Sequence, residues 1–303
     1  MNSFVINDEV KNALANNQPV VALESTLISH GLPKTDSLRV ARLAEAAIRA
    51  SGAIPATIAV SRGKVLVGLS DLELDHFANT DNNWKLSTDN IATAIVQEAS
   101  GGTTVSATMI CAHLAGIHVF ATGGIGGVHH GWQSSLDISS DLTQLSRTPV
   151  TVVCSGAKSI LDLPATVEKL ETLGVPIIGL ATKQLPAFFS QESGLVLRQT
   201  AVDVEQAAKI ITTRRSLRLV GGEILAVPVP RNAALPWTSV QEWVSKASAE
   251  ANKKQLTGSL VTPFILQRLR ELSDDQTLNA NIALIENNAS IAGHLAIELI
   301  LNT

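Results

Sequence analysis

The sequence lacks the features that mark a disulfide-stabilised, membrane-spanning or nucleic-acid-coating protein. Its two cysteines, Cys111 and Cys154, are too few for a disulfide framework and do not stand in Cys-X-X-Cys spacing. No basic segment followed by an apolar core opens the chain, and its apolar runs are too short to cross a membrane. The net charge of −4 comes without any block of like charges, which argues against a polyanion-binding surface. We therefore expect a cytoplasmic protein with neither a membrane nor a nucleic acid as its partner.

The composition that is present suits a well-buried globular enzyme. The chain has 303 residues, of which 45% are apolar and 17% are charged. No internal repeat, low-complexity stretch or clear linker divides it. We therefore predict a single domain over residues 1–303, with a helical C-terminal part packed on a sheet.

Strand and helix patterns alternate along most of the chain. The predicted strands are 20–23, 57–60, 64–69, 84–86, 117–122, 150–154, 175–180 and 223–229. The predicted helices are 37–50, 71–79 with Asp71 as its cap, 89–100, 104–115, one starting at Asp137, one through Leu163 and Leu170, then 203–215, 238–252, 263–272 and 279–301. This order predicts an α/β fold in which helices cover both faces of a mainly parallel sheet.

Four glycines, at positions 123, 124, 126 and 127, follow the strand predicted at 117–122. They do not form a dinucleotide fingerprint, because the third glycine would fall at His129, and no Gly-Lys-Ser/Thr follows to make a P-loop. They either make a tight turn or let the backbone approach a ligand, and their density favours the ligand. Ligands of open α/β sheets bind beyond the carboxyl ends of the strands, so we expect a site for an anionic small molecule here.

Two lysines and a glutamate are candidates for chemistry at this edge. Lys158 follows the strand predicted at 150–154, where it is either a salt-bridged or exposed strand-end residue or a nucleophilic amine. An amine attacks only when it is neutral, which requires desolvation or a nearby cation. Three interpretations of Lys85 stay open: it is the cation near Lys158, a phosphate ligand, or an ordinary solvated lysine. Glu24, at the end of the strand predicted at 20–23, is oriented at a ligand or at a backbone N–H.

The segment DISSD adds acidic and hydroxyl side chains. Asp137 and Asp141 flank Ser139 and Ser140 at a predicted helix start, and their spacing alone favours N-capping. The alternative is a hard-metal site completed by water, beside N–H groups that bind phosphate. His129 is a weaker metal candidate, since it and the adjacent histidine rarely face one ion together.

Eight long segments carry idiosyncratic motifs. They are ALESTLISHGLP (22–33), GGTTVSATMI (101–110), VFATGGIGGVHHG (119–131), DISSDL (137–142), VVCSGAKSILDL (152–163), LETLGVP (170–176), LPAFF (185–189) and NIALIENNA (281–289). Together they closely resemble the pseudouridine-5′-phosphate glycosidase family, also called indigoidine synthase A-like. The resemblance runs in order through nearly the whole chain without a large gap.

The resemblance implies a three-layer α/β/α fold with a mixed, mainly parallel central sheet, a homotrimer, and one divalent cation, usually Mn²⁺. It implies reversible cleavage of pseudouridine 5′-phosphate to uracil and ribose 5-phosphate. Lys158 matches the family's imine-forming nucleophile, Glu24 its proton donor and Asp137 its metal ligand. The positions that match its substrate contacts are Lys85, Val105, Ser139, Ser140 and Asp141, together with Thr122, His129 and Asn281, which are expected near the base.

The chain departs from the family pattern beside the ligand-facing loops. His130 stands where the family usually has Arg, and residues 87–90 (STDN) replace a stretch like SRRD. Residues 132–136 (WQSSL) replace the usual AEHTF. These departures bear on base selectivity and phosphate affinity more than on the chemistry, because the nucleophile, the acid and the metal ligand are all kept.

Two other functions compete with a C-glycosidase. One is a C-glycosyl synthase that joins ribose 5-phosphate to another aromatic acceptor, and the departures at 130 and 132–136 are its only support. The other is a catalytically silent sugar-phosphate-binding protein, against which the joint retention of Lys158, Glu24 and Asp137 argues.

Overall fold

The computed structural model describes every residue except 1–2, 32–33, 81, 257–260 and 303. Its strands are β1 Phe4–Ile6, β2 Val20–Leu23, β3 Ile54–Ser61, β4 Lys64–Val67, β5 Trp84–Leu86, β6 Gly101–Thr103, β7 Val119–Ala121, β8 Thr151–Cys154, β9 Ile177–Leu180, β10 Gln199–Ala201 and β11 Ile224–Ala226. Its helices are α1 Asp8–Ala15, the π-helical turn η1 Leu27–Gly31, α2 Lys34–Ala50, α3 Asp71–Asn79, α4 Ile91–Val96, α5 Val105–Ala115, α6 Trp132–Ser135, α7 Ser140–Leu145, α8 Leu163–Thr172, α9 Val204–Ser216, α10 Trp237–Lys253, α11 Val261–Leu272 and α12 Gln276–Leu301.

The strands form an eleven-stranded sheet in the order β1-β4-β3-β2-β7-β8-β11-β9-β10, with β6 paired to β3 and β5 paired to β6. Eight neighbouring pairs are parallel, and the pairs β3–β4 and β3–β6 are antiparallel. The β3–β4 pair is the expected hairpin, whose turn at Arg62 and Gly63 has positive φ angles of 47° and 71°. The sheet is thus mixed and mainly parallel, as expected.

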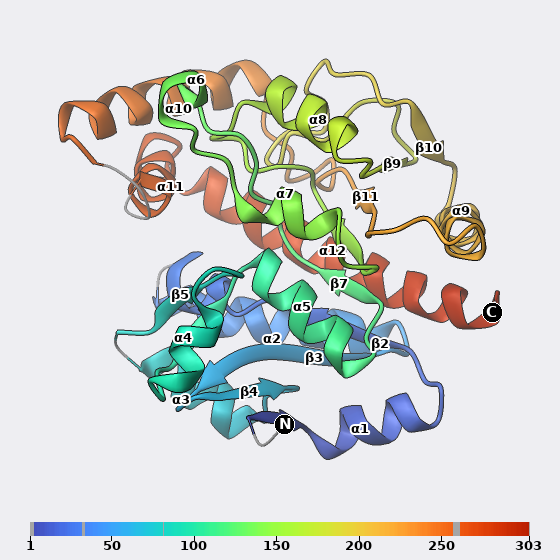
Figure 1. Cartoon of the computed structure of the whole chain (residues 1–303). Coiled ribbons are helices and arrows are strands. Elements are labelled where there is room, and N and C mark those ends of the chain that lie inside the picture. Colours follow the sequence, from blue (N-terminus) through green and yellow to red (C-terminus); the bar gives the residue numbers. More distant parts are fainter. Residues whose placement is uncertain (1–2, 32–33, 81, 257–260, 303) are drawn as a thin grey trace.

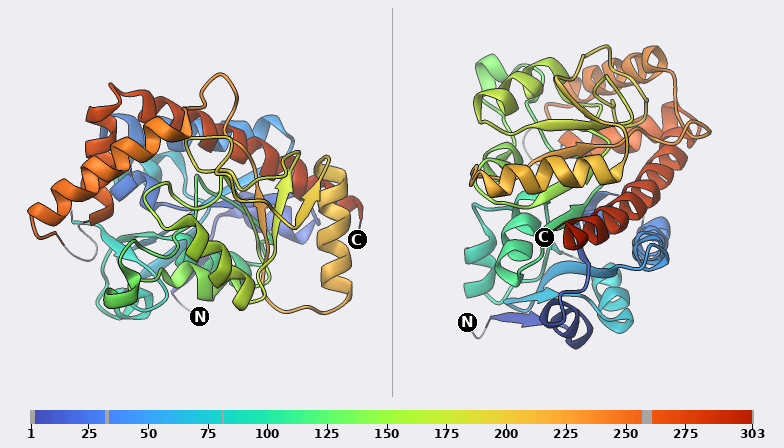
Figure 2. Two further views of the ribbon diagram at one scale, coloured as in Figure 1. Left: turned by 90° about the horizontal axis from the view of Figure 1, so that it is seen from above. Right: turned by 90° about the vertical axis from the view of Figure 1, so that its right-hand side faces the viewer.

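Helices cover both faces of this sheet (Figure 1). α2 and α12 pack together on one face, where α12 crosses β2, β7 and β8 (Figure 2). α5 lies on the opposite face against β2, β3 and β7, and it packs beside α7. The prediction of a three-layer α/β/α fold is confirmed.

The central strands read as unbroken apolar runs because helices cover them on both sides. All four residues of β2 and of β8 are buried. On α12, small residues let the helix approach the end of α2 closely. A Cβ at Gly293 would lie only 1.9 Å from Ser51 Oγ, so this contact requires glycine. The long last helix is therefore fixed against the sheet and against α2.

Several local predictions were wrong. Ser70, not Asp71, caps α3, in a capping box with Glu73. The helix expected at 89–100 is only Ile91–Val96, because Glu98 takes a positive φ of 52° and the glycines that were expected to close it pair as strand β6. No helix starts at Asp137. Ser139 caps α7 by accepting a hydrogen bond from the Asp141 N–H.

Candidate active site

A cavity of about 410 Å³ opens beyond the carboxyl ends of β2, β6, β7 and β8. Ligand pockets of α/β sheets lie at such edges and have volumes of this order. Of the residues that the sequence singled out, the cavity wall includes Glu24, Lys85, Val105, His129, Asp137, Ser139, Ser140, Asp141 and Lys158. The structure thus brings together both candidate catalytic residues, the candidate metal ligand and most of the candidate substrate contacts.

Lys158 is held by a backbone bridge between two loops. The glycine loop after β7 and the turn after β8 pair in parallel at Ile125 and Ala157, which continues the β7–β8 pairing past the strand ends. The Lys158 N–H donates to the Ile125 carbonyl at 3.1 Å. Gly156 makes the turn possible, because its φ is +81° and a Cβ there would lie 2.2 Å from the Pro186 carbonyl oxygen. Both loops therefore present Lys158 to the cavity on a fixed backbone.

Lys85 reaches the same cavity from β5. Loss of hydration against the cavity wall lowers the pKa of Lys85, and the positive charge of Lys158 lowers it further. The carboxylates of Asp141, Glu24 and Asp137 act in the opposite direction. The lowered pKa of Lys85 thus comes from its position in the cavity beside Lys158.

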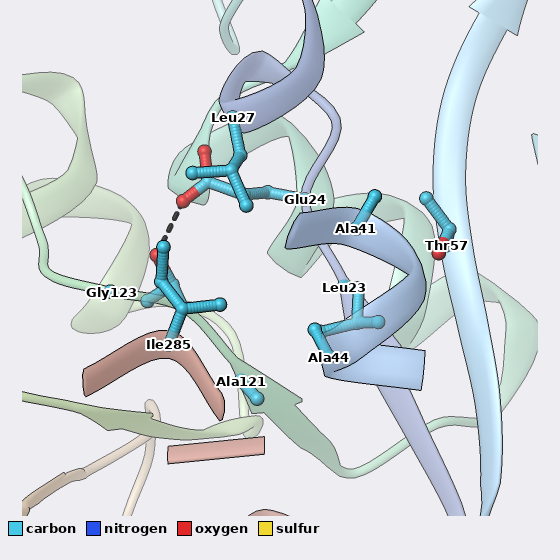
Figure 3. Close-up of a pocket in the computed structure, with 10 residues that line it drawn as sticks. Leu23, Glu24, Leu27, Ala41, Ala44, Thr57, Ala121, Gly123 and Ile285 are labelled. Carbon is cyan, nitrogen blue, oxygen red and sulfur yellow. Dashed lines mark hydrogen bonds between the residues drawn. The ribbon is translucent and has the colours of Figure 1, made fainter. Parts of the chain in front are cut away.

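Glu24 is oriented by two threonines. The Thr26 and Thr122 hydroxyls donate to its two carboxylate oxygens, one each. Behind Glu24 lies a void of about 20 Å³, wide enough for one water molecule, and Leu27 and Ile285 flank it (Figure 3). The carboxyl group thus has a mostly apolar back and a polar front that faces the cavity. Thr122 does not line the main cavity and reaches it only through Glu24.

Asp141 organises the end of the cavity beside the start of α5. Its buried carboxylate accepts hydrogen bonds from the Ser106 N–H at 2.9 Å and the Gly126 N–H at 2.8 Å. Gly126 must be glycine, because a Cβ there would lie 2.3 Å from Ser139 Oγ. Asp141 thereby ties the start of α5 to the glycine loop. Its role in this structure is to shape the wall rather than to offer free oxygens.

The N-terminus of α5 offers an anion only part of its N–H groups, because the Ser106 N–H donates to the Asp141 carboxylate. Thr104 precedes the helix without capping it through its side chain. The first N–H groups of a helix have no intrahelical partner, and the helix dipole favours negative charge there. Ser106 Oγ lies 3.1 Å from Ser140 Oγ, so the hydroxyl groups of α5 and α7 meet beside Val105. The cavity therefore has a phosphate-compatible end near Lys85.

Asp137, the metal ligand expected from the sequence, lies exposed on the cavity wall. The His129 N–H donates to the Asp137 carbonyl at 3.1 Å, and burial lowers the pKa of His129 while the Asp137 carboxylate opposes this. Within the described part of the chain, no group of three or more His, Cys, Asp or Glu could hold a metal ion. A lone carboxylate fits a hard cation that keeps most of its water ligands, and it does not fit a zinc site.

Asn281 does not line the main cavity but a second compartment, beside His30 of η1. If Gly123, the residue that follows Thr122, carried a Cβ atom, that atom would lie 3.5 Å from Asn281 Oδ1. Asn281 thus lies beside Gly123, while His129 lines the cavity that contains Lys158. The sequence reading missed Thr26 and His30. The chain bends at Ser25 and turns helical at Thr26, so no strand alternation in the sequence marked Thr26, and no signal existed for His30.

The family model described as "Indigoidine synthase A like protein" matches residues 9–298. The chain belongs to the indigoidine synthase A-like family. It is 46% identical to the pseudouridine-5′-phosphate glycosidase of Glaesserella parasuis serovar 5 over 98% of both chains. It is 50% identical to the enzyme of the same name from Paracoccus denitrificans over 97% of both chains. Relatives this similar over their full length show that the chain is an enzyme.

Two solved structures share its fold. The prealnumycin C-glycosynthase AlnA, in complex with ribulose 5-phosphate, superposes with a TM-score of 0.91 at 37% identity, covering 99% of this chain and 97% of that one. An indigoidine synthase A-like protein from Thermotoga maritima superposes with a TM-score of 0.89 at 35% identity, covering 98% and 96%. Among the helices that the structure describes, none is long and apolar enough to cross a membrane.

Proposed function

We propose that this chain is a C-glycosidase that reversibly cleaves pseudouridine 5′-phosphate to uracil and ribose 5-phosphate. The observation that carries the proposal is the meeting of Lys158, Lys85 and Glu24 in one cavity that ends at the N-terminus of α5. The names of the full-length relatives support it. The alternative is synthesis of a C-glycoside on another aromatic acceptor, which the likeness to a C-glycosynthase favours. Both reactions act at C1 of the same sugar phosphate and are assigned to the same residues.

The bond to be broken joins ribose C1′ to uracil C5, so a simple oxocarbenium departure would ask a poor carbon leaving group to leave. In the proposed mechanism the sugar ring opens and the Lys158 amine bonds to C1′ in place of the ring oxygen. Cleavage of the C1′–C5 bond then leaves C1′ as an imine on Lys158, and water hydrolyses this imine to release ribose 5-phosphate. C5 of uracil must be protonated before the bond breaks, which needs a placed acid. Glu24 delivers this proton. Thr26 and Thr122 support the assignment, because their hydroxyls fix the direction in which the carboxyl group faces.

Phosphate is proposed to bind at the other end of the cavity. The N–H groups near Val105 and at Ser140 hold it, and the Lys85 ammonium group lies nearby. The Ser139 N–H was also expected to bind phosphate, but it donates to the Gly127 carbonyl at 2.9 Å. Asp141 contributes by keeping the starts of α5 and α7 and the glycine loop in register. Binding energy from phosphate orients the sugar over Lys158. Uracil is proposed to contact Thr122, His129 and Asn281.

A divalent cation, Mn²⁺ by family resemblance, is proposed to bind Asp137 largely through water. It supplies positive charge beside the phosphate and needs no further protein ligand. The exposed position of Asp137 on the cavity wall supports this arrangement. A homotrimer in the cytoplasm completes the proposal, and light scattering after size exclusion measures the subunit number.

The test of the function is incubation with pseudouridine 5′-phosphate and Mn²⁺, with the absorbance change followed as uracil forms. A silent binding protein gives no change. Borohydride reduction during incubation with ribose 5-phosphate, followed by peptide mass mapping, is expected to leave a stable adduct on Lys158. Lys158→Ala should lose both adduct and turnover, whereas Glu24→Ala should keep the adduct and lose cleavage. An adduct on Lys85, or normal turnover of Lys158→Ala, would refute the assignment.

A further inference from the structure

Asn288 is a fully buried amide of α12, the helix that packs across β7 and β8 (Figure 1). Its Nδ2 donates to the Thr122 carbonyl at 2.9 Å and to the Gly123 carbonyl at 3.4 Å. Ser155 Oγ lies 3.2 Å from the same nitrogen and 3.3 Å from Oδ1. Thr122 directly follows β7, and Ser155 directly follows β8. One side chain of the last helix therefore bonds to both loops that lead into the site.

Packing alone does not account for an amide at this position of α12. Leu284, Ala292 and Leu295 lie on the same face of the helix, at spacings of three and four residues, and all three are fully buried. A polar side chain among them is unfavourable unless it is hydrogen-bonded. The hydrogen bonds that Asn288 makes to the two loops therefore explain why this position is polar.

The bond to Thr122 lies at the point where β2 and β7 separate. Their pairing ends at Leu23 and Ala121. The next residues, Glu24 and Thr122, are joined through their side chains instead, because the Thr122 hydroxyl donates to a carboxylate oxygen of Glu24. A buried carbonyl group needs a hydrogen-bond donor. Asn288 supplies that donor to the Thr122 carbonyl in place of a neighbouring strand.

The attachment of Lys158 depends less on this amide. The Lys158 N–H donates to the Ile125 carbonyl, and the Ile125 N–H donates to the Gly156 carbonyl, both at 3.1 Å. These two backbone bonds hold the turn after β8 against the glycine loop. The contact of the Ser155 hydroxyl with Asn288 is additional to them. Removal of the amide is therefore expected to disturb the acid more than the lysine.

We propose that Asn288 positions Glu24 for proton transfer to carbon, by fixing the peptide group between Thr122 and Gly123. The inference rests on the proposed function, because Glu24 is the acid of that reaction. Threonine is stiff at χ1, so the direction of the Thr122 hydroxyl follows the direction of its backbone. Asn288 is a positioning residue and not a catalytic one, since it is absent from the described wall of the main cavity.

The first experiment separates proton delivery from imine formation. Asn288→Leu keeps a side chain of similar size and removes the donor. With pseudouridine 5′-phosphate and Mn²⁺, we expect kcat to fall by about tenfold and KM to change by less than about threefold. Borohydride trapping with ribose 5-phosphate should still label Lys158 at a rate within about twofold of the wild type. Equal losses of cleavage and of trapping would overturn the inference.

A double-mutant cycle with Thr122→Val tests the route through Thr122. If Asn288 acts on Glu24 through that residue, the second substitution has little left to remove. The variant with both changes should then have a kcat within about threefold of the slower single variant. Losses that multiply in the double variant would show that Asn288 acts by another route, and would overturn the inference. A wild-type protein that releases no uracil would refute the proposed function itself.

Thr151→Val is the matched control. Thr151 is fully buried at the start of β8, at the other end of the strand from Lys158, and its hydroxyl donates to the Glu223 carboxylate. This variant also loses a buried hydrogen bond, so it should unfold at a lower temperature but keep kcat within about twofold. A fall in kcat equal to that of Asn288→Leu would overturn the inference. If Asn288→Leu does not fold, Asn288→Ser takes its place in both experiments.

Discussion

Replacement of Asp141 by Asn tests how the anion-binding end of the cavity is built. The wild-type carboxylate accepts one backbone N–H on each oxygen, from Ser106 at 2.9 Å and from Gly126 at 2.8 Å. An amide of the same shape keeps one oxygen and turns an NH₂ group toward the other donor. One buried N–H therefore loses its acceptor, and the remaining bond loses its charge.

The expected loss follows from these two changes. A hydrogen bond to a charged acceptor contributes about 1.5–3 kcal/mol, and a buried donor left without a partner costs about 1–3 kcal/mol. Part of each loss is relieved by relaxation of the loop, so we expect the free energy of unfolding to fall by about 2–4 kcal/mol. Because the start of α5 is also released, kcat/KM for the 5′-phosphate substrate should fall by about 100-fold.

Urea denaturation measures the first effect as a lower midpoint at an unchanged slope. The control is Asp89→Asn, which makes the same change on an exposed residue of the same cavity whose carboxylate accepts from the Ser87 hydroxyl. We expect that variant to stay within about 0.5 kcal/mol of the wild type. An Asp141→Asn protein that unfolds at the wild-type urea concentration would refute the view that this carboxylate ties α5 to the glycine loop.

Three further predictions concern the acid, a buried glutamate and the cation. Thr26→Val and Thr122→Val should each lower kcat for cleavage about tenfold, which is a rise of about 1.4 kcal/mol in the activation free energy, while the borohydride adduct on Lys158 still forms. Thr172→Val, on an exposed helix position, is the control, and an equal loss of kcat in that variant would contradict the prediction. Burial raises the pKa of Glu45, so its stabilising contribution is present below its unfolded pKa of about 4.3 and is lost as pH rises through the folded value. Glu45→Gln should therefore unfold at a higher temperature than the wild type at pH 7, whereas below pH 4 it should have no such advantage. Equal unfolding temperatures at pH 7 would show the reasoning to be wrong. Excess chelator should remove most activity and Mn²⁺ should restore it, with Asp137→Ala needing more Mn²⁺; full activity in chelator would exclude the cation.

The sequence predicted most of the sheet because its strands are long apolar runs or follow clear turn residues. It also singled out the sheet edge at which the main cavity opens, since glycines and titratable residues follow β7 and β8. Gly101 and Gly102 were mistaken for a helix end. They are glycines because β6 is squeezed between neighbours, and a Cβ on Gly101 would lie 2.6 Å from the Trp84 carbonyl oxygen. Only the tertiary structure contains that contact.

The parts of the site that could not be predicted depend on distant pairings. Thr122 reaches Glu24 across 98 positions of sequence, and Asp141 reaches Ser106 across 35. Local spacing suggested N-capping for Asp141, and a cap does exist there, but Ser139 provides it. The family resemblance placed Asn281 near the base. It carried no information about the compartment that Asn281 lines, because that space arises where η1, α11 and α12 meet.

The position of α12 in the chain has a consequence for biosynthesis. This helix covers one face of the central strands and supplies Asn281, yet it emerges from the ribosome after every other described element. A nascent chain that stops before residue 276 therefore leaves the apolar face of β2, β7 and β8 uncovered. Such a chain is prone to aggregation and is a substrate for chaperones and proteases. Premature termination thus yields no partly active product, because the sheet and the ligand site are completed by the same late segment.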